Sequence, residues 1–219
     1  MQESSLHAAL KKHYARSGGL QEAPVDGYLV DVVRQGLLIE IQTGNFTAIR
    51  DKLNVLLDNH HLLLVYPVAQ EKWIVRLPAE GDTPISRRRS PKRGQVTEIF
   101  RELVRIPSLM THPNLSLEVL LVREEEIRRD DGRGSWRRKG WSIVDHRLLE
   151  VVHSHLFQTP QDLLTLIPDS LQEPFTSKDL AAAMGVRRYI AQKAAYCLRN
   201  MQVIAIAGKR GRAYLYTYT

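Results

Sequence analysis

The stretch YLVDVVR-QG-LLIEIQT, residues 28–43, predicts two β-strands joined by a tight turn. Both arms are rich in Val, Ile and Leu, and the pair Gln35-Gly36 is typical of a two-residue hairpin loop. Counting outward from such a loop places Asp31 directly opposite Glu40. Like charges directly opposite each other across two strands are destabilising, so we expect a cation to neutralise this pair. Carboxylate oxygens a few ångströms apart suit Mg²⁺.

Side chains alternate along a strand, and this divides the hairpin into two faces. We expect one face to be buried, because it is almost wholly apolar: Tyr28, Val30, Val32, Ile39, Ile41 and Thr43. The opposite face mixes polar with apolar residues: Leu29, Asp31, Val33, Leu38, Glu40 and Gln42. The alternative is a pair of solvent-facing acids on an amphipathic hairpin, but the apolar residues beside them argue against simple exposure.

At these residues the sequence resembles the PD-(D/E)XK (restriction-endonuclease-like) nuclease superfamily, which carries an Asp on one strand and Glu-X-Lys on the next. Asp31 takes the Asp position, Glu40 the Glu position and Gln42 the Lys position. The resemblance covers the first third to half of the chain and implies an α/β fold with a mixed sheet flanked by helices. It also implies phosphodiester hydrolysis with Mg²⁺ or Mn²⁺, held by Asp31, Glu40 and the backbone carbonyl of Ile41. Gln42 would orient the attacking water but cannot supply the positive charge of a lysine.

Three further residues near the hairpin are candidates for the same site. Glu22 and Asp26 are additional acids that could help to hold a metal, although Asp26 also fits an ordinary bend. Lys52 lies on a helix expected at about residues 47–59, and from there it could reach back and replace the missing motif lysine. The alternative for Lys52 is an ordinary surface charge.

Composition limits the class of protein and of partner. The 219 residues fit one large or two small domains, and the formal net charge of +7 favours an acidic partner such as nucleic acid over a membrane. The N-terminus has no apolar run of signal-peptide length and no transmembrane segment is apparent, so we expect a cytoplasmic protein. The single Cys197 excludes an internal disulfide and a Cys-rich zinc site. No Walker loop, dinucleotide fingerprint or GxSxG elbow is present.

The order of elements predicts an α/β nuclease-like domain over residues 1–141. A helix over residues 5–16 precedes the hairpin. After the helix at 47–59, HLLLVYPVA and KWIVRL predict two separate strands. A helix is expected at 96–106, and a strand at 116–122.

Two basic stretches of this domain are candidates for holding the DNA backbone. SRRRSPKRG carries Arg87, Arg88, Arg89, Lys92 and Arg93, and GSWRRKGW sets Arg137, Arg138 and Lys139 between Trp136 and Trp141. Such cations attract phosphates, and an exposed Trp can stack on unpaired bases. The alternative is that the two Trp side chains anchor a loop while its charges are solvated.

Residues 142–219 predict a second, mostly helical domain that begins with a helix carrying Leu148, Leu149, Val152 and Leu156. A capping box, two helices and a β-hairpin with a basic turn follow, and this order resembles a winged helix. The resemblance implies that the second helix and the hairpin contact DNA through Arg188, Tyr189, Gln192, Lys193, Tyr196, Arg199, Lys209, Arg210 and Arg212. A winged helix used for dimerisation or protein contact is the alternative.

Together these patterns predict a metal-dependent DNA endonuclease that a winged helix directs to duplex or branched DNA. Cutting both strands symmetrically would suit a homodimer. The alternative is a non-catalytic DNA-binding protein, a regulator or structural component whose nuclease fold is degenerate. A third alternative is a protein whose nucleic-acid partner is RNA instead of DNA.

Overall fold

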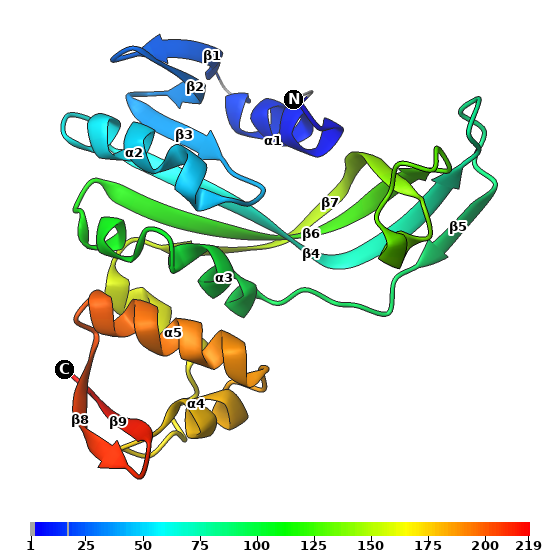
Figure 1. The fold of residues 1–219 in the computed structure, drawn as a ribbon. Coiled ribbons are helices and arrows are strands. Elements are labelled where there is room, and N and C mark those ends of the chain that lie inside the picture. The colour runs from blue at the N-terminus through cyan, green and yellow to red at the C-terminus, as the bar shows by residue number, and fades with distance from the viewer. Residues whose placement is uncertain (1–2, 17) are drawn as a thin grey trace.

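The computed structural model describes residues 3–16 and 18–219 of the chain (Figure 1). Its centre is a mixed seven-stranded sheet in the order β1-β2-β3-β4-β6-β7, in which β5 pairs with β4. The strands are β1 (Leu20–Val25), β2 (Tyr28–Arg34), β3 (Leu37–Ile41), β4 (Leu62–Leu77), β5 (Ser86–Arg89), β6 (Leu115–Arg129) and β7 (Ser142–Phe157). A separate two-stranded sheet pairs β8 (Ile204–Arg210) with β9 (Ala213–Tyr218). The α-helices are α1 (Ser5–Ala15), α2 (Arg50–Leu57), α3 (Phe100–Leu103), α4 (Ser177–Ala183) and α5 (Arg188–Asn200), and the short 3₁₀ turns are Phe46–Ile49, Val96–Ile99, Pro107–Thr111, Trp136–Arg138 and Pro160–Leu166.

Helices cover both faces of the sheet, which confirms the predicted mixed sheet flanked by helices. The apolar stripe Leu6, Leu10 and Tyr14 of α1 is buried on one face, against a core that includes Ile39. The other face packs on α2 and α3 through a larger core that includes Leu53. The β3–β4 and β4–β6 pairs are parallel, whereas β2–β3 and β6–β7 are antiparallel.

The hairpin has the predicted register. Arg34 pairs with Leu37 across the turn, and both turn residues have positive φ, 51° at Gln35 and 81° at Gly36. These values suit a type I′ turn, which twists in the same sense as the strands. The ladder of paired residues continues to Val32–Ile39, immediately before Asp31 and Glu40.

The predicted buried face of the hairpin is wrong in part. Val32 packs with Ile39 in the core under α1, as expected, but Tyr28 and Val30 belong to the core under α2. Thr43 is exposed. The reason is that the β2–β3 ladder stops at Val32, so residues before it no longer follow the alternation of the paired segment.

The long strands differ most from the sequence predictions. Residues 62–77 form one strand, β4, with a register shift between Ala69 and Glu71, and β6 runs well beyond the predicted end at residue 122. Strand β1 was not predicted, nor was β5 within the first basic stretch. Figure 1 shows β4, β6 and β7 extending past the helices toward β5.

The predicted helix at the start of the second domain is wrong, because Ser142–Phe157 is strand β7 of the main sheet. A boundary after residue 141 would separate β7 from its partner β6, so the sheet domain continues to Phe157. Three register shifts between β6 and β7 interrupt the pairing, and the exposure of β7 does not alternate regularly. A bulged edge strand of this kind loses the two-residue period by which a strand is recognised.

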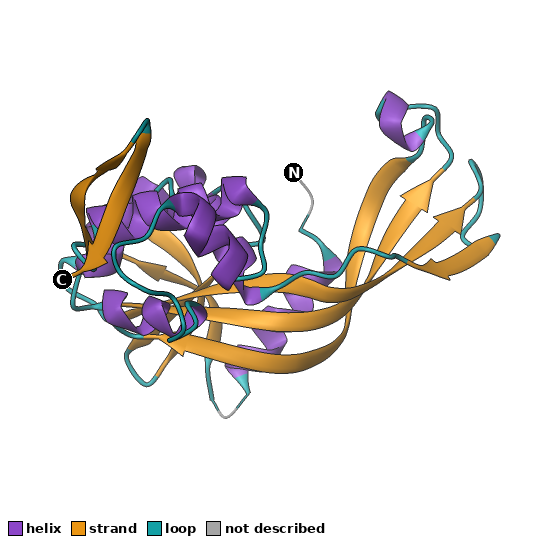
Figure 2. Cartoon of the chain, turned by 90° about the horizontal axis from the view of Figure 1, so that it is seen from below, coloured by secondary structure: helices purple, strands orange, loops and turns teal. Residues whose placement is uncertain are grey.

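The C-terminal residues form the predicted order of helix, turn, helix and hairpin. Thr176 and Asp179 make a capping box at the start of α4, and Gly185 with a φ of 63° follows its end. Figure 2 shows this part of the chain beside the helices of the main sheet. Side chains of α5, including Ala194 and Leu198, lie in the same core as Phe100 of α3. The C-terminal helices are therefore packed on the sheet domain through a shared core.

We expect Leu10→Ala to lower the free energy of unfolding by about 2–5 kcal/mol, because Leu10 is completely buried between α1 and the sheet. Urea unfolding followed by circular dichroism would measure the change. Val55→Ala is the matched control, since Val55 is 41% exposed on α2 and its truncation should cost well under about 1 kcal/mol. Equal losses in the two variants would contradict the packing of α1 described here.

Candidate functional site

Asp31 and Glu40 lie where the two strands of the hairpin stop pairing through their backbones. The Ile41 amide donates to Asp31 Oδ2 at 2.8 Å, and the Asp31 amide donates to Glu40 Oε1 at 3.2 Å. Each carboxylate thus accepts a backbone hydrogen bond from the opposite strand. These exchanged bonds bring the two acids together and fix one oxygen of each.

Lys52 of α2 reaches the acid pair. Its Nζ donates to the Leu29 carbonyl at 2.6 Å and makes an ion pair with Glu40 Oε1. Both side chains are largely removed from solvent, at 16% exposure for Lys52 and 6% for Glu40. The structure therefore brings together the two acids and the basic residue that the sequence analysis proposed as a substitute for the motif lysine.

His7 of α1 approaches the pair from the other side of the sheet. Its Nε2 lies 3.0 Å from Asp31 Oδ2, and its Nδ1 lies 2.9 Å from Glu3 Oε1. Lys11 contacts Glu3 and Glu22, each at 2.6 Å. An alternating chain of acids and bases on α1 and β1 thus ends at Asp31. Sequence reasoning missed His7, because only the fold places α1 over the hairpin.

The environments of the two acids push their pKa values in opposite directions. Burial acts to raise the pKa of Asp31, but the hydrogen bonds from His7 and Ile41 outweigh it and lower that pKa. Burial and the nearby Asp31 charge raise the pKa of Glu40, against the opposing effect of Lys52. Asp31 is therefore held as a carboxylate, and the charge of Glu40 depends on a cation beside it.

The donor set of the pair suits a hard divalent cation. Within the described residues, Asp31 Oδ1 and Glu40 Oε2 accept no hydrogen bond, so each acid keeps one oxygen for a ligand. No group of three or more His, Cys, Asp or Glu side chains in residues 3–16 and 18–219 is arranged to hold a metal. Mg²⁺ is commonly held by one or two carboxylates and several waters, so a pair of acids is compatible with such a site.

The other predicted metal and catalytic residues direct their side chains to groups outside the pair. The amide group of Gln42 donates to the Gly44 carbonyl, so its nitrogen is turned toward the following turn. Glu22 is tied to Lys11, and Asp26 to His60 with an Nε2–Oδ2 distance of 2.8 Å. Among the described contacts none of these three side chains touches Asp31 or Glu40 directly, and Glu22 is linked to Asp31 only through Lys11, Glu3 and His7.

The first basic stretch contains strand β5, and several of its basic side chains are paired with acids. Arg87 Nε donates to Glu125 Oε1 at 2.7 Å, and its guanidinium lies 5.1 Å from the centre of the Trp73 ring. Arg89 makes an ion pair with Glu71. Arg88, between them, is exposed. Strand β5 therefore presents a partly neutralised edge of the sheet.

The two Trp side chains of the second basic stretch differ in their surroundings. Trp136 is 84% exposed, with Arg137 beside its ring. Trp141 lies against Arg76 at 4.9 Å, and its carbonyl accepts from Arg138 Nε at 3.2 Å. Trp141 thus anchors the loop, whereas Trp136 is open to a partner.

The predicted recognition helix α5 divides into an inward and an outward side. Tyr189 lies under Arg101 at 5.0 Å, and Lys193 Nζ donates to the Arg101 carbonyl at 3.3 Å, so both contact α3 rather than an open surface. The outward residues Arg188, Gln192 and Tyr196 are exposed, Arg199 is partly exposed, and on the hairpin Lys209, Arg210 and Arg212 are exposed. Their exposure leaves this surface accessible to a partner.

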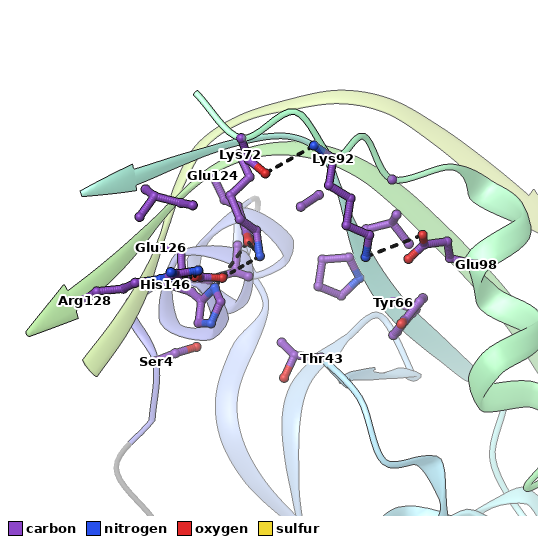
Figure 3. A pocket seen from close by; sticks show the side chains of 17 residues that line it. Ser4, Thr43, Tyr66, Lys72, Lys92, Glu98, Glu124, Glu126, Arg128 and His146 are labelled. Carbon is purple, nitrogen blue, oxygen red and sulfur yellow. Dashed lines mark hydrogen bonds and ion pairs between the residues drawn. The ribbon is translucent and has the colours of Figure 1, made fainter. Parts of the chain in front are cut away.

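A second polar cluster, absent from the sequence predictions, lines a cavity of about 550 Å³ over β4, β6 and β7 (Figure 3). Lys72 Nζ lies 2.9 Å from Glu124 and 2.8 Å from Glu126, and both Glu side chains are buried. His146 Nδ1 lies 3.2 Å from Glu124, and Arg128 pairs with Glu126. The alternation of Glu124, Glu126 and Arg128 in one strand was the available signal, but Lys72 and His146 come from other strands.

This cluster predicts a loss of stability in acid. Burial acts to raise the pKa of both Glu124 and Glu126. His146 and Lys72 outweigh burial at Glu124, and Lys72 and Arg128 outweigh it at Glu126, so both pKa values lie below the usual 4.5. A lowered folded-state pKa stabilises the fold above the unfolded pKa, and this contribution disappears as the pH falls through the folded value. Urea unfolding between pH 7 and pH 3 should therefore show a steeper loss in the unaltered protein than in Glu124→Gln. Parallel curves for the two would contradict the ionised cluster.

No helix of the described residues is long and apolar enough to cross a membrane.

Comparison with known proteins places the chain in a family. Residues 4–158 match the family described as "Domain of unknown function (DUF8091)", and this span ends where β7 ends. An uncharacterized protein of Treponema pallidum (strain Nichols) is 36% identical over 216 residues, which cover 98% of this chain and 84% of the relative. No solved structure matches the chain significantly. The chain therefore belongs to the DUF8091 family.

Proposed function

We propose that this protein is a metal-dependent DNA endonuclease with its active centre at Asp31, Glu40 and Lys52. The observation that carries the proposal is that these side chains, from β2, β3 and α2, meet where the backbone pairing of β2 with β3 ends. Two acids and a lysine are the residue types of the nuclease motif that the hairpin resembles. Here the lysine comes from the following helix instead of the motif position at Gln42.

Each residue has a distinct part in phosphodiester hydrolysis. When bound, Mg²⁺ or Mn²⁺ supplies a Lewis acid for a phosphoryl oxygen and lowers the pKa of its bound water. Asp31 remains ionised through the hydrogen bonds from His7 and Ile41, which also fix its orientation. The Lys52 ammonium group forms an ion pair with Glu40, and in this position it would stabilise the negative charge that develops on the phosphate in the transition state.

The C-terminal part supports DNA as the partner. The net charge is +7, and the outward side of α5 and the β8–β9 hairpin carry exposed basic residues. We propose that this part acts as a winged helix, with α5 at the DNA and the hairpin turn at the adjacent backbone. The inward position of Tyr189 and Lys193 removes these two residues from the contact surface, which consists of the outward residues of α5 and the residues of the hairpin.

One observation favours the alternative of a non-catalytic DNA-binding protein. The Gln42 amide is held by the turn at Gly44, so nothing replaces the motif lysine on β3 itself. In that case the Lys52–Glu40 pair would serve stability alone, and DNA would be bound without being cut.

A cleavage assay separates the two functions. The purified protein is incubated with labelled linear duplex, branched duplex, single-stranded DNA and RNA, in Mg²⁺, in Mn²⁺ and in chelator. We expect cleavage of at least one DNA form in metal and none in chelator. Binding of DNA without cleavage in any condition would support the non-catalytic function, and selective cleavage of RNA would overturn DNA as the substrate.

A further inference from the structure

We infer that a basic cavity between the sheet domain and α5 binds one phosphate group of the DNA. The cavity has a volume of about 440 Å³ and lies between the segment after β5, the start of α3 and the turn before α5. Its basic lining residues come from all three segments: Lys92, Arg93, Arg101 and Arg187. This inference rests on the proposed DNA function and assigns it a contact away from Asp31, Glu40 and Lys52.

The acids around this cavity do not balance its positive charge. Lys92 and Arg101 share Glu98, at 3.7 and 3.8 Å, and it is the one acid among the described lining residues. Arg93 approaches Glu71 at 3.5 Å, but Glu71 also pairs with Arg89 and Arg123. These long, shared contacts leave a positive excess for a ligand to neutralise.

The charge of Arg187 adds to this excess. It is exposed immediately before α5, and within the described part of the chain it makes no ion pair. Its position places a fourth cation on the side of the cavity formed by the C-terminal part. Cations from two segments far apart in the sequence can therefore act on one anion.

Arg101 is held in position by its contacts with α5. Its guanidinium stacks over Tyr189 at 5.0 Å, and its backbone carbonyl accepts from Lys193. Its Nε is buried and has no hydrogen-bond partner among the described residues. The side chain as a whole is 35% exposed, and its Nη2 lies 3.8 Å from Glu98, so an outer nitrogen of the guanidinium rather than the buried Nε is the group that can donate to an oxyanion.

A phosphate group fits this combination of features. Guanidinium groups bind phosphate oxygens with paired, charge-assisted hydrogen bonds, and a lysine adds a point charge. The cavity volume falls within the range of ordinary ligand sites, so a phosphate with its attached sugar can enter. Internal backbone phosphates and terminal 5′-phosphates of DNA share this chemistry.

Thermal unfolding in sodium phosphate and in sodium chloride of equal ionic strength tests the cavity. The site variant is Lys92→Gln/Arg187→Gln, and the control is Lys12→Gln/Arg50→Gln, which removes two exposed charges that do not line the cavity. We expect the Tm of the unaltered protein and of the control to be higher in phosphate than in chloride. The Tm of the site variant should be the same in both salts. Equal Tm values of the unaltered protein in both salts would overturn the inference.

DNA binding in chelator, measured by fluorescence anisotropy, then identifies the source of the phosphate. The site variant should bind duplex more weakly than the control, and the slope of log K against log salt should fall in magnitude by about 1, because one phosphate contact is lost. If the unaltered protein binds 5′-phosphorylated duplex more tightly than 5′-hydroxyl duplex and the site variant does not, the cavity binds a terminal phosphate. If the site variant binds both duplexes more weakly by the same factor, the cavity binds an internal phosphate. Unchanged duplex binding by the site variant would overturn DNA as the source. Both readouts are independent of cleavage, so failure of the nuclease proposal is distinguishable from failure of this one.

Discussion

Asp31→Asn should abolish measurable DNA cleavage, with a fall in rate on the order of a thousandfold, while DNA affinity changes less than about twofold. The magnitude corresponds to the several kcal/mol of transition-state stabilisation expected of a metal ligand. Asn keeps the shape of the side chain and an oxygen that can accept from the Ile41 amide, so the hairpin should remain folded. Single-turnover cleavage and anisotropy on the same labelled DNA measure the two effects.

The matched control for this variant is Asp51→Asn on α2. Asp51 is 87% exposed and its carboxylate lies at the solvent-facing start of the helix, so the substitution removes the same charge without touching the acid pair. Cleavage by the control should stay within about twofold of the unaltered protein. If Asp31→Asn retained full cleavage, the active centre would have to lie elsewhere in the molecule.

Lys52→Met should lower the free energy of unfolding at pH 7 by about 3 kcal/mol, because it leaves Glu40 buried without its cation. Burial and Asp31 already raise the pKa of Glu40, and loss of Lys52 raises it further. A carboxyl group whose folded pKa is raised destabilises the fold above its unfolded pKa. The deficit should therefore shrink as the pH falls through the raised pKa of Glu40 in the folded protein, and should have disappeared below about 4.5, its unfolded value.

Urea unfolding of Lys52→Met, Glu40→Gln and the double variant measures the coupling between the two residues. The double variant should recover part of the stability lost in Lys52→Met, since it no longer buries an unpaired charge. Lys12→Met is the control, because Lys12 is exposed on α1 and should lose less than about 0.5 kcal/mol. A loss in Lys52→Met that the second substitution does not reduce would contradict the buried ion pair.

The hairpin could be predicted from local sequence, because a two-residue turn determines which residues pair. Arg34 pairs with Leu37 as counted, and Asp31 and Glu40 follow directly after the last pair. The exchanged bonds through Ile41 and the Asp31 amide could not be predicted, because they arise where the backbone ladder stops. Sequence periodicity indicates pairing but not the point at which two strands part.

Other parts of the site depend on contacts between distant segments. Lys52 could be named from the sequence as a candidate, whereas its contact with Glu40 depends on how α2 packs on the sheet. His7 and the cluster around Lys72 have no local motif, since their partners lie far along the chain. Strand β7 was mistaken for a helix because its bulges remove the alternation that identifies a strand.

The most direct test of the central claim is the metal dependence of cleavage by the unaltered protein and by Glu40→Gln. Cleavage of a labelled DNA substrate is followed over time in Mg²⁺ and in chelator. The concentration of each protein is chosen so that the same fraction of the DNA is bound. The account predicts products only for the unaltered protein in Mg²⁺. Cleavage that persists in chelator, or that is equal in Glu40→Gln, would contradict the assignment of the acid pair as the active centre.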